Sequence, residues 1–313
     1  MLQEIPKCPV VRFAPSPSGR MHAGNIASAL IAWLLTRLQD GKIVLRIEDL
    51  DRSRSKQEHI DSILNDFVNL GLTWDDGPYY QACNQDAYAA AFRELSTKEH
   101  VYPCFCSRAD LAAARAPHEG EYAVYPGTCR NLSPVEISSA SERKQPAYRI
   151  EMPPRIIKFD DFFQGNQSYA LDTQCGDVII RRADGGFSYQ LAVAVDDAQQ
   201  GINLVSRGYD LLSSTPVQIY LQESLGYHAP EYAHLPLLVS EDGIRLSKRN
   251  KDASIDDMLN TYHTYQGIIG HIAWLYGLIE DDIPVSPDEL TSFLSLESLK
   301  NVLWKRETFV WKA

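Results

Sequence analysis

The sequence predicts an α/β protein with a doubly wound parallel sheet, and three observations support this expectation. The apolar run 10–13 ends in a loop rich in Pro, Ser and Gly, after which residues 26–34 show helical periodicity. Residues 42–47 have the composition of a buried strand, and the apolar positions of 60–70 again recur at helical spacing before Gly71. The order strand, helix, strand, helix is typical of α/β proteins.

Composition limits the class of protein. A chain of 313 residues can bury a full core, either as one domain with an insertion or as two domains. Binding to the phosphates of nucleic acid requires positive charge, so a net charge of −11 argues against a protein that binds nucleic acid over its whole surface. A local stripe of basic residues is compatible with this charge. The N-terminus lacks a basic segment followed by an apolar one, and no apolar run approaches the roughly 18 residues of a membrane span. We therefore expect a cytoplasmic protein, and by default a monomer.

The middle of the chain differs in character from its first hundred residues. A helix is expected over 86–98, followed at 101–174 by a cysteine pair, several prolines and short alternating segments such as 148–152. We interpret 101–174 as an insertion.

The sheet pattern is expected to resume after the insertion. Residues 177–182 have strand character, and the Asp-Gly turn that follows predicts a hairpin returning through 187–195. A strand over 203–206 and a helix from 214 to Gly226 come next. The last core strand is predicted at 234–239, and from 254 onward we expect short helices without a new sheet.

Chemistry-bearing residues gather at the ends of the predicted strands. His22 precedes a helix start, where backbone amides and the helix dipole favour anions such as phosphate. Glu48 follows the second strand, at the sheet edge where ligands of such proteins bind. A basic loop spans 245–249. The chain contains neither G-x-x-x-x-G-K-[ST] nor G-x-G-x-x-G, so a P-loop kinase or a dinucleotide oxidoreductase has no support.

These motifs carry a resemblance to a known family. His22-Ala-Gly-Asn25 resembles the HIGH signature of class I aminoacyl-tRNA synthetases, and Arg245-Leu-Ser-Lys-Arg249 resembles their KMSKS signature. The segments 12–19, 46–49 and 205–210 are similar to the glutamyl branch of that class. The similarity covers residues 10 to about 252, with the motifs in the family's order.

The resemblance implies a fold and a domain organisation. It implies a Rossmann-like catalytic domain over 1–240, interrupted by a zinc-binding, acceptor-contacting insertion at 101–174. A KMSKS-like loop and a helical region would follow over 241–313.

The chemistry implied is the attack of a carboxylate on the α-phosphate of ATP, which requires Mg²⁺ with the nucleotide. Such a step needs alignment of two anions and fixed donors for the developing charge. His22 suits the α-phosphate, Lys248 suits the leaving pyrophosphate, and Gly24 lets the backbone approach the nucleotide. Catalytic roles are expected for His22, Asn25 and Lys248, and ATP binding for His22, Gly24, Asn25, Arg245, Leu246, Ser247, Lys248 and Arg249. Asn25 replaces the final His of HIGH, which leaves its role open.

A glutamate substrate needs cations for its two carboxylates and an anion for its ammonium. Arg12 and Arg207 can supply bidentate forks, Glu48 can hold the ammonium, and Tyr189 can donate a hydrogen bond. By resemblance the glutamate pocket comprises Arg12, Ala14, Ser16, Glu48, Tyr189 and Arg207. Taken alone, Glu48 and Tyr189 would more often be structural residues.

Three cysteines form a candidate site for one structural zinc ion. Cys104, Cys106 and Cys129 supply three thiolates of the four ligands that zinc requires. The resemblance points to Tyr125 as the fourth ligand, while His118 is the alternative on chemical grounds. The alternative, less favoured than a zinc site, is three reduced cysteines without a metal.

The length of the chain bears on the acceptor. About 60 residues follow the basic loop, too few for the anticodon-binding region of full-length glutamyl-tRNA synthetases. The resemblance is greatest to short members that transfer L-glutamate to queuosine at the wobble position of tRNA(Asp). Two alternatives stay open: a truncated enzyme that charges a tRNA 3′ end, and a catalytically silent RNA-binding paralogue.

Overall fold

A computed structural model of the chain describes residues 5–107, 110, 124–244, 246 and 254–311. Its first group of strands comprises β1 (Val10–Phe13), β2 (Lys42–Ile47) and β3 (Asp76–Tyr80), which pair in parallel in the order β1-β2-β3. The two strands predicted in this part of the chain are confirmed. β3, with its Gly and Pro, adds a third.

A second group of strands extends the sheet. It comprises β6 (Ile156–Asp161), β7 (Gly165–Ala170), β9 (Leu204–Gly208) and β10 (Glu231–Leu235), in the order β7-β6-β10-β9. β6, β10 and β9 run parallel, and β7 is antiparallel to β6. Asn203 joins the groups beside β1, since its side-chain Oδ1 accepts from the backbone N–H of Val10 at 2.7 Å and its own N–H donates to the Val10 carbonyl at 3.1 Å.

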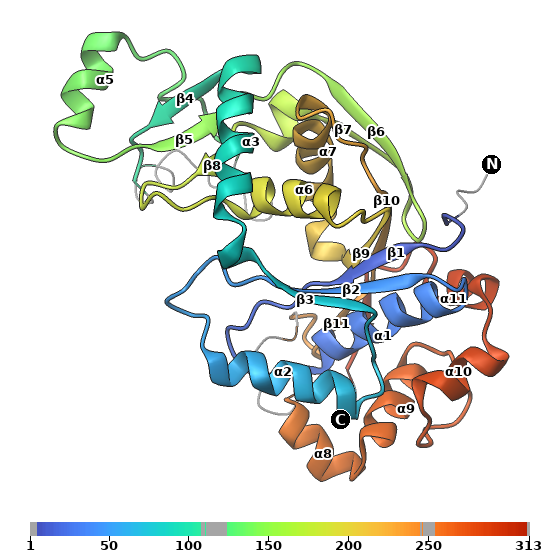
Figure 1. Ribbon diagram of the computed structural model, residues 1–313. Helices are drawn as coiled ribbons and strands as arrows, with labels where there is room; N and C mark the ends of the chain where they lie inside the picture. Colours follow the sequence, from blue (N-terminus) through green and yellow to red (C-terminus); the bar gives the residue numbers. More distant parts are fainter. Residues whose placement is uncertain (1–4, 108–109, 111–123, 245, 247–253, 312–313) are drawn as a thin grey trace.

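Helices cover both faces of this sheet (Figure 1). On one face lie α1 (Ala23–Arg37) and α2 (Gln57–Asn69), and on the other lie α3 (Gln85–Lys98), α6 (Tyr189–Gln199) and α7 (Thr215–Ser224). The helices expected over 26–34, 60–70, 86–98 and 214–226 are therefore present. The α/β class with a doubly wound parallel sheet is confirmed.

A smaller sheet stands apart from the main one at the upper left of Figure 1. It consists of β4 (Val101–Cys104), β5 (Ala147–Ile150) and β8 (Val178–Arg181), which pair antiparallel in that order, with α5 (Pro134–Ser141) beside them.

The predicted limits of the insertion, 101–174, do not follow the strand pairing. β6 and β7 lie within those limits but belong to the main sheet, and β8 lies beyond them but pairs with β5. The chain thus leaves the small sheet for the main one and returns before α6. Sequence position alone gave no indication of this exchange.

The hairpin strand predicted over 187–195 is wrong, because the chain turns into α6 at Tyr189. The turn before it exists, since the N–H of Arg182 donates to the Gly186 carbonyl at 2.7 Å, but only an isolated bridge between Arg181 and Phe187 follows. Ser188 then caps a helix by accepting from the N–H of Leu191. Burial around the whole circumference of this helix explains a continuous apolar run that resembles a strand.

The last predicted strand, 234–239, is divided at Pro236. Proline has no N–H for a ladder, and β10 ends before it while β11 (Leu237–Val239) begins after it. β11 pairs in parallel with β12 (Thr308–Val310), so the expectation of no new sheet after 254 is also wrong. The helices expected there are present: α8 (Ile255–Tyr262), α9 (Tyr265–Leu275), α10 (Pro287–Phe293) and α11 (Leu296–Leu303).

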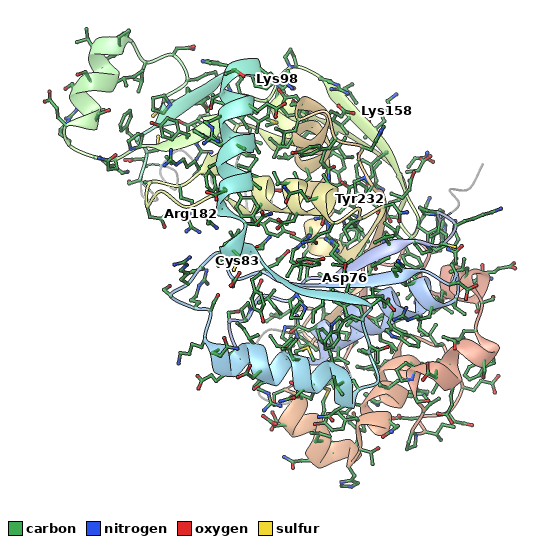
Figure 2. The ribbon with its side chains drawn as sticks, in the orientation of Figure 1. Asp76, Cys83, Lys98, Lys158, Arg182 and Tyr232 are labelled. Carbon is green, nitrogen blue, oxygen red and sulfur yellow. The ribbon has the colours of Figure 1, made fainter. Side chains whose placement is uncertain are left out.

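Buried side chains occupy the space between the layers, as Figure 2 shows for Tyr232, whereas Lys98, Lys158 and Arg182 project outward. One apolar core joins α1 to the C-terminal helices, and a second lies among α3, α6 and α7. Short helical turns occur at Gln81–Cys83, Leu171–Cys175 and Tyr209–Ser214. No helix in the described part of the chain has the length and apolar character needed to cross a membrane.

Candidate active site

Two adjoining hollows of about 200 and 460 Å³ form a cleft beyond the carboxyl ends of β1, β2 and β9. The cleft brings together the described residues predicted to bind ATP or glutamate: Arg12, Ala14, Ser16, His22, Gly24, Asn25, Glu48, Tyr189, Arg207 and Leu246. Arg245, Ser247, Lys248 and Arg249 lie outside the described residues. Residues from distant parts of the chain thus line one cavity, at the sheet edge where parallel α/β proteins bind ligands.

The start of α1 is held by a reciprocal cap. His22 Nδ1 accepts from the backbone N–H of Gly24 at 3.1 Å, and Asn25 Oδ1 accepts from the backbone N–H of His22 at 3.3 Å. Because Nδ1 is an acceptor, a neutral His22 ring carries its proton on Nε2, where it is a donor. Asn25, whose role the sequence left open, completes the cap. A Cβ at Gly24 would lie 3.1 Å from His22 Cε1, so glycine keeps this corner uncrowded.

One residue of the KMSKS-like motif, Leu246, and the segment that follows the motif are anchored at the same place. Leu246 is buried in the cleft wall and donates its N–H to the Leu238 carbonyl at 3.1 Å. Beyond the motif, Ser254 forms a bridge with His22, and Ile255 donates its N–H to the Met21 carbonyl at 3.2 Å. The chain therefore enters and leaves the second motif beside the first.

Alternating buried charges form the floor of the cleft. Asp197 lies between two guanidinium groups, with its Oδ1 at 2.8 Å from Arg46 Nη1 and 3.3 Å from Arg12 Nε. Burial alone would raise the pKa of Asp197, but Arg46 and Arg12 hold it below its ordinary value. Asp197 is thus a carboxylate at neutral pH and fixes both arginines from beneath.

The pKa of Glu48 shifts in the opposite direction from that of Asp197. Burial raises the pKa of Glu48 above its ordinary value, even though Arg46 and Arg12 oppose that shift. Its Oε1 lies 3.7 Å from Arg46 Nη2, a longer contact than those of Asp197. An arriving cation would favour the charged form of this carboxyl group, which fits a partner for an ammonium.

Arg207 is almost fully engaged by the protein. Nε donates to His234 Nε2 at 3.1 Å, Nη1 to Gln218 Oε1 at 2.7 Å, and Nη2 to both Thr215 Oγ1 at 2.8 Å and the Leu211 carbonyl at 3.3 Å. A guanidinium has five N–H groups, so among the described residues one N–H, on Nη1, remains for a ligand. The expected bidentate fork is therefore reduced to a single donor in this arrangement.

Arg12 keeps more of its donors for a ligand. Its Nε lies against Asp197, and Nη1 donates to the Ser206 carbonyl at 3.1 Å. Within the described part of the chain, both hydrogens of Nη2 and one of Nη1 are left over, which preserves a two-donor edge. Arg12, more than Arg207, retains the geometry of a fork for a carboxylate.

Cys104, Cys106 and Cys129 meet with Tyr125 in the small sheet. The three sulfurs lie within 4.8 Å of one another, and the Cys106 and Cys129 sulfurs are 3.6 Å apart. The Tyr125 hydroxyl oxygen lies 3.5 Å from the Cys104 sulfur and 3.6 Å from the Cys106 sulfur. Tetrahedral zinc with Zn–S of about 2.3 Å and Zn–O of about 2.0 Å places sulfurs about 3.8 Å apart and oxygen about 3.5 Å from sulfur. The donor set fits a metal ion of that size. His118 lies outside the described residues.

A buried arginine supports this cluster. Arg149 Nε donates to the Cys104 sulfur at 3.3 Å, and its guanidinium lies 3.9 Å from the centre of the Tyr125 ring. Burial opposes ionisation of Cys104, but hydrogen bonds from Tyr125 and Arg149 outweigh it and lower the pKa of the thiol. A thiolate is the form that binds metal.

Several site residues were not identified from the sequence. Asp210 lines both hollows, and Gly208 has no room for a Cβ, which would lie 2.6 Å from Asp210 Oδ1. Within the segment 205–210, Arg207 was singled out from the sequence, but neither Gly208 nor Asp210 was. Asp161 and His234, which lie behind Arg207, are 73 residues apart and share no local motif that could have found them.

Comparisons with known proteins agree with this geometry. The family model described as tRNA synthetases class I (E and Q), catalytic domain, matches residues 10–268. A protein of Symbiobacterium thermophilum named Glutamyl-Q tRNA(Asp) synthetase is 42% identical over 297 residues, covering 91% of this chain and 92% of that protein. A protein of the same name from Nitratidesulfovibrio vulgaris is 42% identical over 299 residues, with 92% of each chain covered.

A solved structure shows the same architecture. The crystal structure of glutamate-tRNA synthetase from Elizabethkingia anophelis superposes with a TM-score of 0.80 at 26% identity, over 97% of this chain and 68% of that one. The family model covers well over half of the chain, and the two relatives cover 91% and 92% of it. The chain therefore belongs to the glutamyl-Q tRNA(Asp) synthetase family, within the class I tRNA synthetases of the glutamyl and glutaminyl type.

Proposed function

We propose that this protein activates glutamate with ATP and transfers the glutamyl group to queuosine in tRNA(Asp). The observation that carries this proposal is the single cleft in which the His22 helix start meets the arginines and Glu48. Relatives at 42% identity that carry the corresponding name support the choice of acceptor.

In the activation step, a carboxylate oxygen of glutamate forms a bond to the α-phosphorus of ATP. The bond from that phosphorus to the bridging oxygen breaks, and pyrophosphate leaves with its electron pair. The described groups that act here are fixed donors: His22 Nε2–H and the amides at the start of α1 serve the α-phosphate. For Lys248 we propose, from its place in the second motif alone, that its charge stabilises the leaving pyrophosphate. Mg²⁺ accompanies the nucleotide and neutralises part of its charge.

Glutamate is held through its three charges. Arg12 supplies the two-donor edge for one carboxylate, and Arg207 supplies one N–H together with its positive charge. The Glu48 carboxylate accepts hydrogen bonds from the ammonium group, and the Tyr189 hydroxyl donates a hydrogen bond to the substrate. These side chains leave the reacting carboxylate directed toward His22, which is the alignment that an in-line displacement needs.

Zinc is the proposed occupant of the cysteine cluster. Cys104, Cys106, Cys129 and Tyr125 would hold one ion, which stabilises the small sheet. β8 leads from that sheet to Tyr189 at the start of α6, so an ordered small sheet helps to fix one wall of the cleft.

The test of the proposed function is incorporation of radiolabelled glutamate into purified tRNA(Asp) with and without queuosine, alongside tRNA(Glu), in the presence of ATP. We expect label only on the queuosine-containing tRNA(Asp). Label on tRNA(Glu) would identify an enzyme that charges a 3′ end. Absence of label together with absence of glutamate-dependent ATP–pyrophosphate exchange would indicate an RNA-binding protein.

A further inference from the structure

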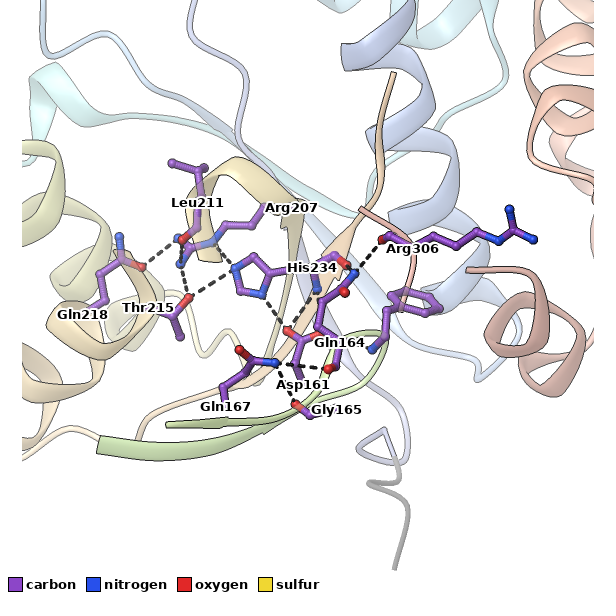
Figure 3. Close-up of polar contacts among 11 residues, drawn as sticks. Asp161, Gln164, Gly165, Gln167, Arg207, Leu211, Thr215, Gln218, His234 and Arg306 are labelled. Carbon is purple, nitrogen blue, oxygen red and sulfur yellow. Dashed lines mark hydrogen bonds and ion pairs between the residues drawn. The ribbon is translucent and has the colours of Figure 1, made fainter. Parts of the chain in front are cut away.

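A fully buried pair, His234 and Asp161, lies directly behind Arg207 (Figure 3). His234 is on β10 and Asp161 is at the end of β6, and both side chains have no exposed surface. His234 Nδ1 is 2.6 Å from Asp161 Oδ2, and His234 Nε2 is 3.1 Å from Arg207 Nε. The three side chains therefore form a chain of contacts that ends at the cleft.

The neighbours of His234 fix the position of its proton. Asp161 is an acceptor, so Nδ1 carries the hydrogen and donates it. Nε2 then accepts from Arg207 Nε–H, and the Thr215 hydroxyl at 3.2 Å can donate to the same nitrogen. Only the neutral ring with Nδ1–H satisfies all of these contacts. Burial and the charge of Arg207 lower the pKa of His234 despite the opposing effect of Asp161, which agrees with a neutral ring.

Asp161 is itself held rigidly. Its Oδ1 accepts from the backbone N–H groups of Phe163, Gln164 and His234, at 3.1, 2.9 and 3.1 Å. Gln164 Nε2 donates to the carbonyls of His234 and Arg306, both at 3.0 Å, which ties the C-terminal segment to the same point (Figure 3). These hydrogen bonds fix the pair to the edge of the sheet on which Arg207 lies.

We propose that His234, with its tautomer set by Asp161, is a positioning residue that orients Arg207 toward a substrate carboxylate. This inference rests on the proposed activation of glutamate and adds a specificity determinant that does not touch the substrate. Among the residues that the structure describes, Arg207 makes four contacts and keeps one N–H for a ligand, so the direction of that N–H depends on the four contacts. Loss of the Nε acceptor removes one of these four contacts, so the guanidinium tilts on the remaining three and its free N–H no longer points at the carboxylate.

Two substitutions at one position separate the contacts. In His234→Gln the amide reaches the place of Nε2, so its oxygen can still accept from Arg207. In His234→Asn the amide reaches only the place of Nδ1 and keeps Asp161 but not Arg207. Asp161→Asn preserves volume and the Oδ1 acceptor, but its amide nitrogen donates to Nδ1, which moves the ring proton to Nε2 against Arg207. His228→Asn, at an exposed histidine, is the matched control.

The assay is ATP–pyrophosphate exchange with glutamate, which needs no acceptor RNA, with KM measured for glutamate and for ATP in the full-length enzyme. We expect His234→Asn and Asp161→Asn to raise the KM for glutamate roughly 10- to 100-fold, the range for one lost hydrogen bond to a charged group. The KM for ATP should stay within about twofold, and His234→Gln and His228→Asn should remain close to wild type.

The outcomes distinguish positioning from a structural role. Equal effects on both KM values, or equal effects of His234→Gln and His234→Asn, would mean that His234 only fills space, and would overturn the inference. If His234→Asn does not fold, Asp161→Asn against His234→Gln still decides between the two roles. A wild-type enzyme that exchanges pyrophosphate with glutamate but labels no tRNA(Asp) would overturn the proposed acceptor while the role of His234 stands.

Discussion

Replacement of Asp197 by asparagine should destabilise the floor of the cleft more than any exposed ion-pair substitution. Asp197 contacts Arg46 at 2.8 Å and Arg12 at 3.3 Å, and all three side chains are almost fully buried. Its lowered pKa means that the carboxylate contributes its full stabilisation above its ordinary pKa of about 4, so an assay at pH 7 measures the whole effect.

The size of the effect follows from what remains after the substitution. Removing one partner of a buried ion pair costs about 3–5 kcal/mol. The asparagine oxygen can still accept one hydrogen bond, and Arg46 keeps Glu48 at 3.7 Å and Asp196 at 3.9 Å. We therefore expect the lower end, about 3 kcal/mol, which corresponds to a Tm decrease of roughly 5 °C for a chain of 313 residues.

Thermal unfolding at pH 7, followed by circular dichroism, measures this difference. The matched control is Glu223→Gln, which removes a carboxylate from an ion pair with Arg155 at 2.7 Å. Those side chains are 40% and 50% exposed, so the Tm should change by no more than about 2 °C. If Asp197→Asn and Glu223→Gln shift the Tm equally, burial does not govern the strength of these pairs and the reasoning is refuted.

Three further predictions concern other parts of the molecule. Cys129→Ser should lower the bound zinc, measured by atomic emission of the purified protein, from about one equivalent to well below half; unchanged zinc would exclude Cys129 as a ligand. Because the pKa of His234 is lowered in the folded protein, unfolding takes up a proton below about pH 6.5, so the unfolding free energy should fall between pH 7.5 and 5.5, by at most about 1.4 kcal/mol from this residue. Urea titrations at both pH values should show a correspondingly smaller loss in His234→Gln. Gly270→Ala should lower the free energy of unfolding by about 1–3 kcal/mol in the same urea titrations, because a Cβ there would lie 1.8 Å from the Ile283 carbonyl oxygen. An unchanged free energy would mean that the segment at Ile283 moves freely to make room.

Sequence patterns predicted correctly those helices and strands whose formation depends on residues close to one another in the chain. The helix of residues 23–37 and the strand of 42–47 follow from periodicity and from the residues that end them, and both are present. The residues that line the cleft were predicted mainly from the resemblance of their motifs to a family, and several of these motifs mark strand ends, which a parallel sheet places at one edge.

Long-range pairing explains what the sequence did not reveal. The helix 189–199 is buried on all sides, so its apolar run lacks the one-sided periodicity of a surface helix. Nothing within 156–161 indicates that it pairs with 231–235, because that choice depends on a strand about 70 residues away. The contact between Asp161 and His234 depends on the same pairing, so it could not be predicted either.

The junction between β1 and β9 has a consequence for how the chain is made. Val10 and Asn203 are 193 residues apart, yet they join the two halves of the sheet. At roughly 5–20 residues per second, a ribosome needs about 10–40 s to deliver Asn203 after Val10. During that interval one edge of β1 has no strand to pair with, and unpaired edges are where nascent chains associate wrongly. Expression at lower temperature or with additional chaperones should therefore raise the yield of folded protein more than changes to the surface would.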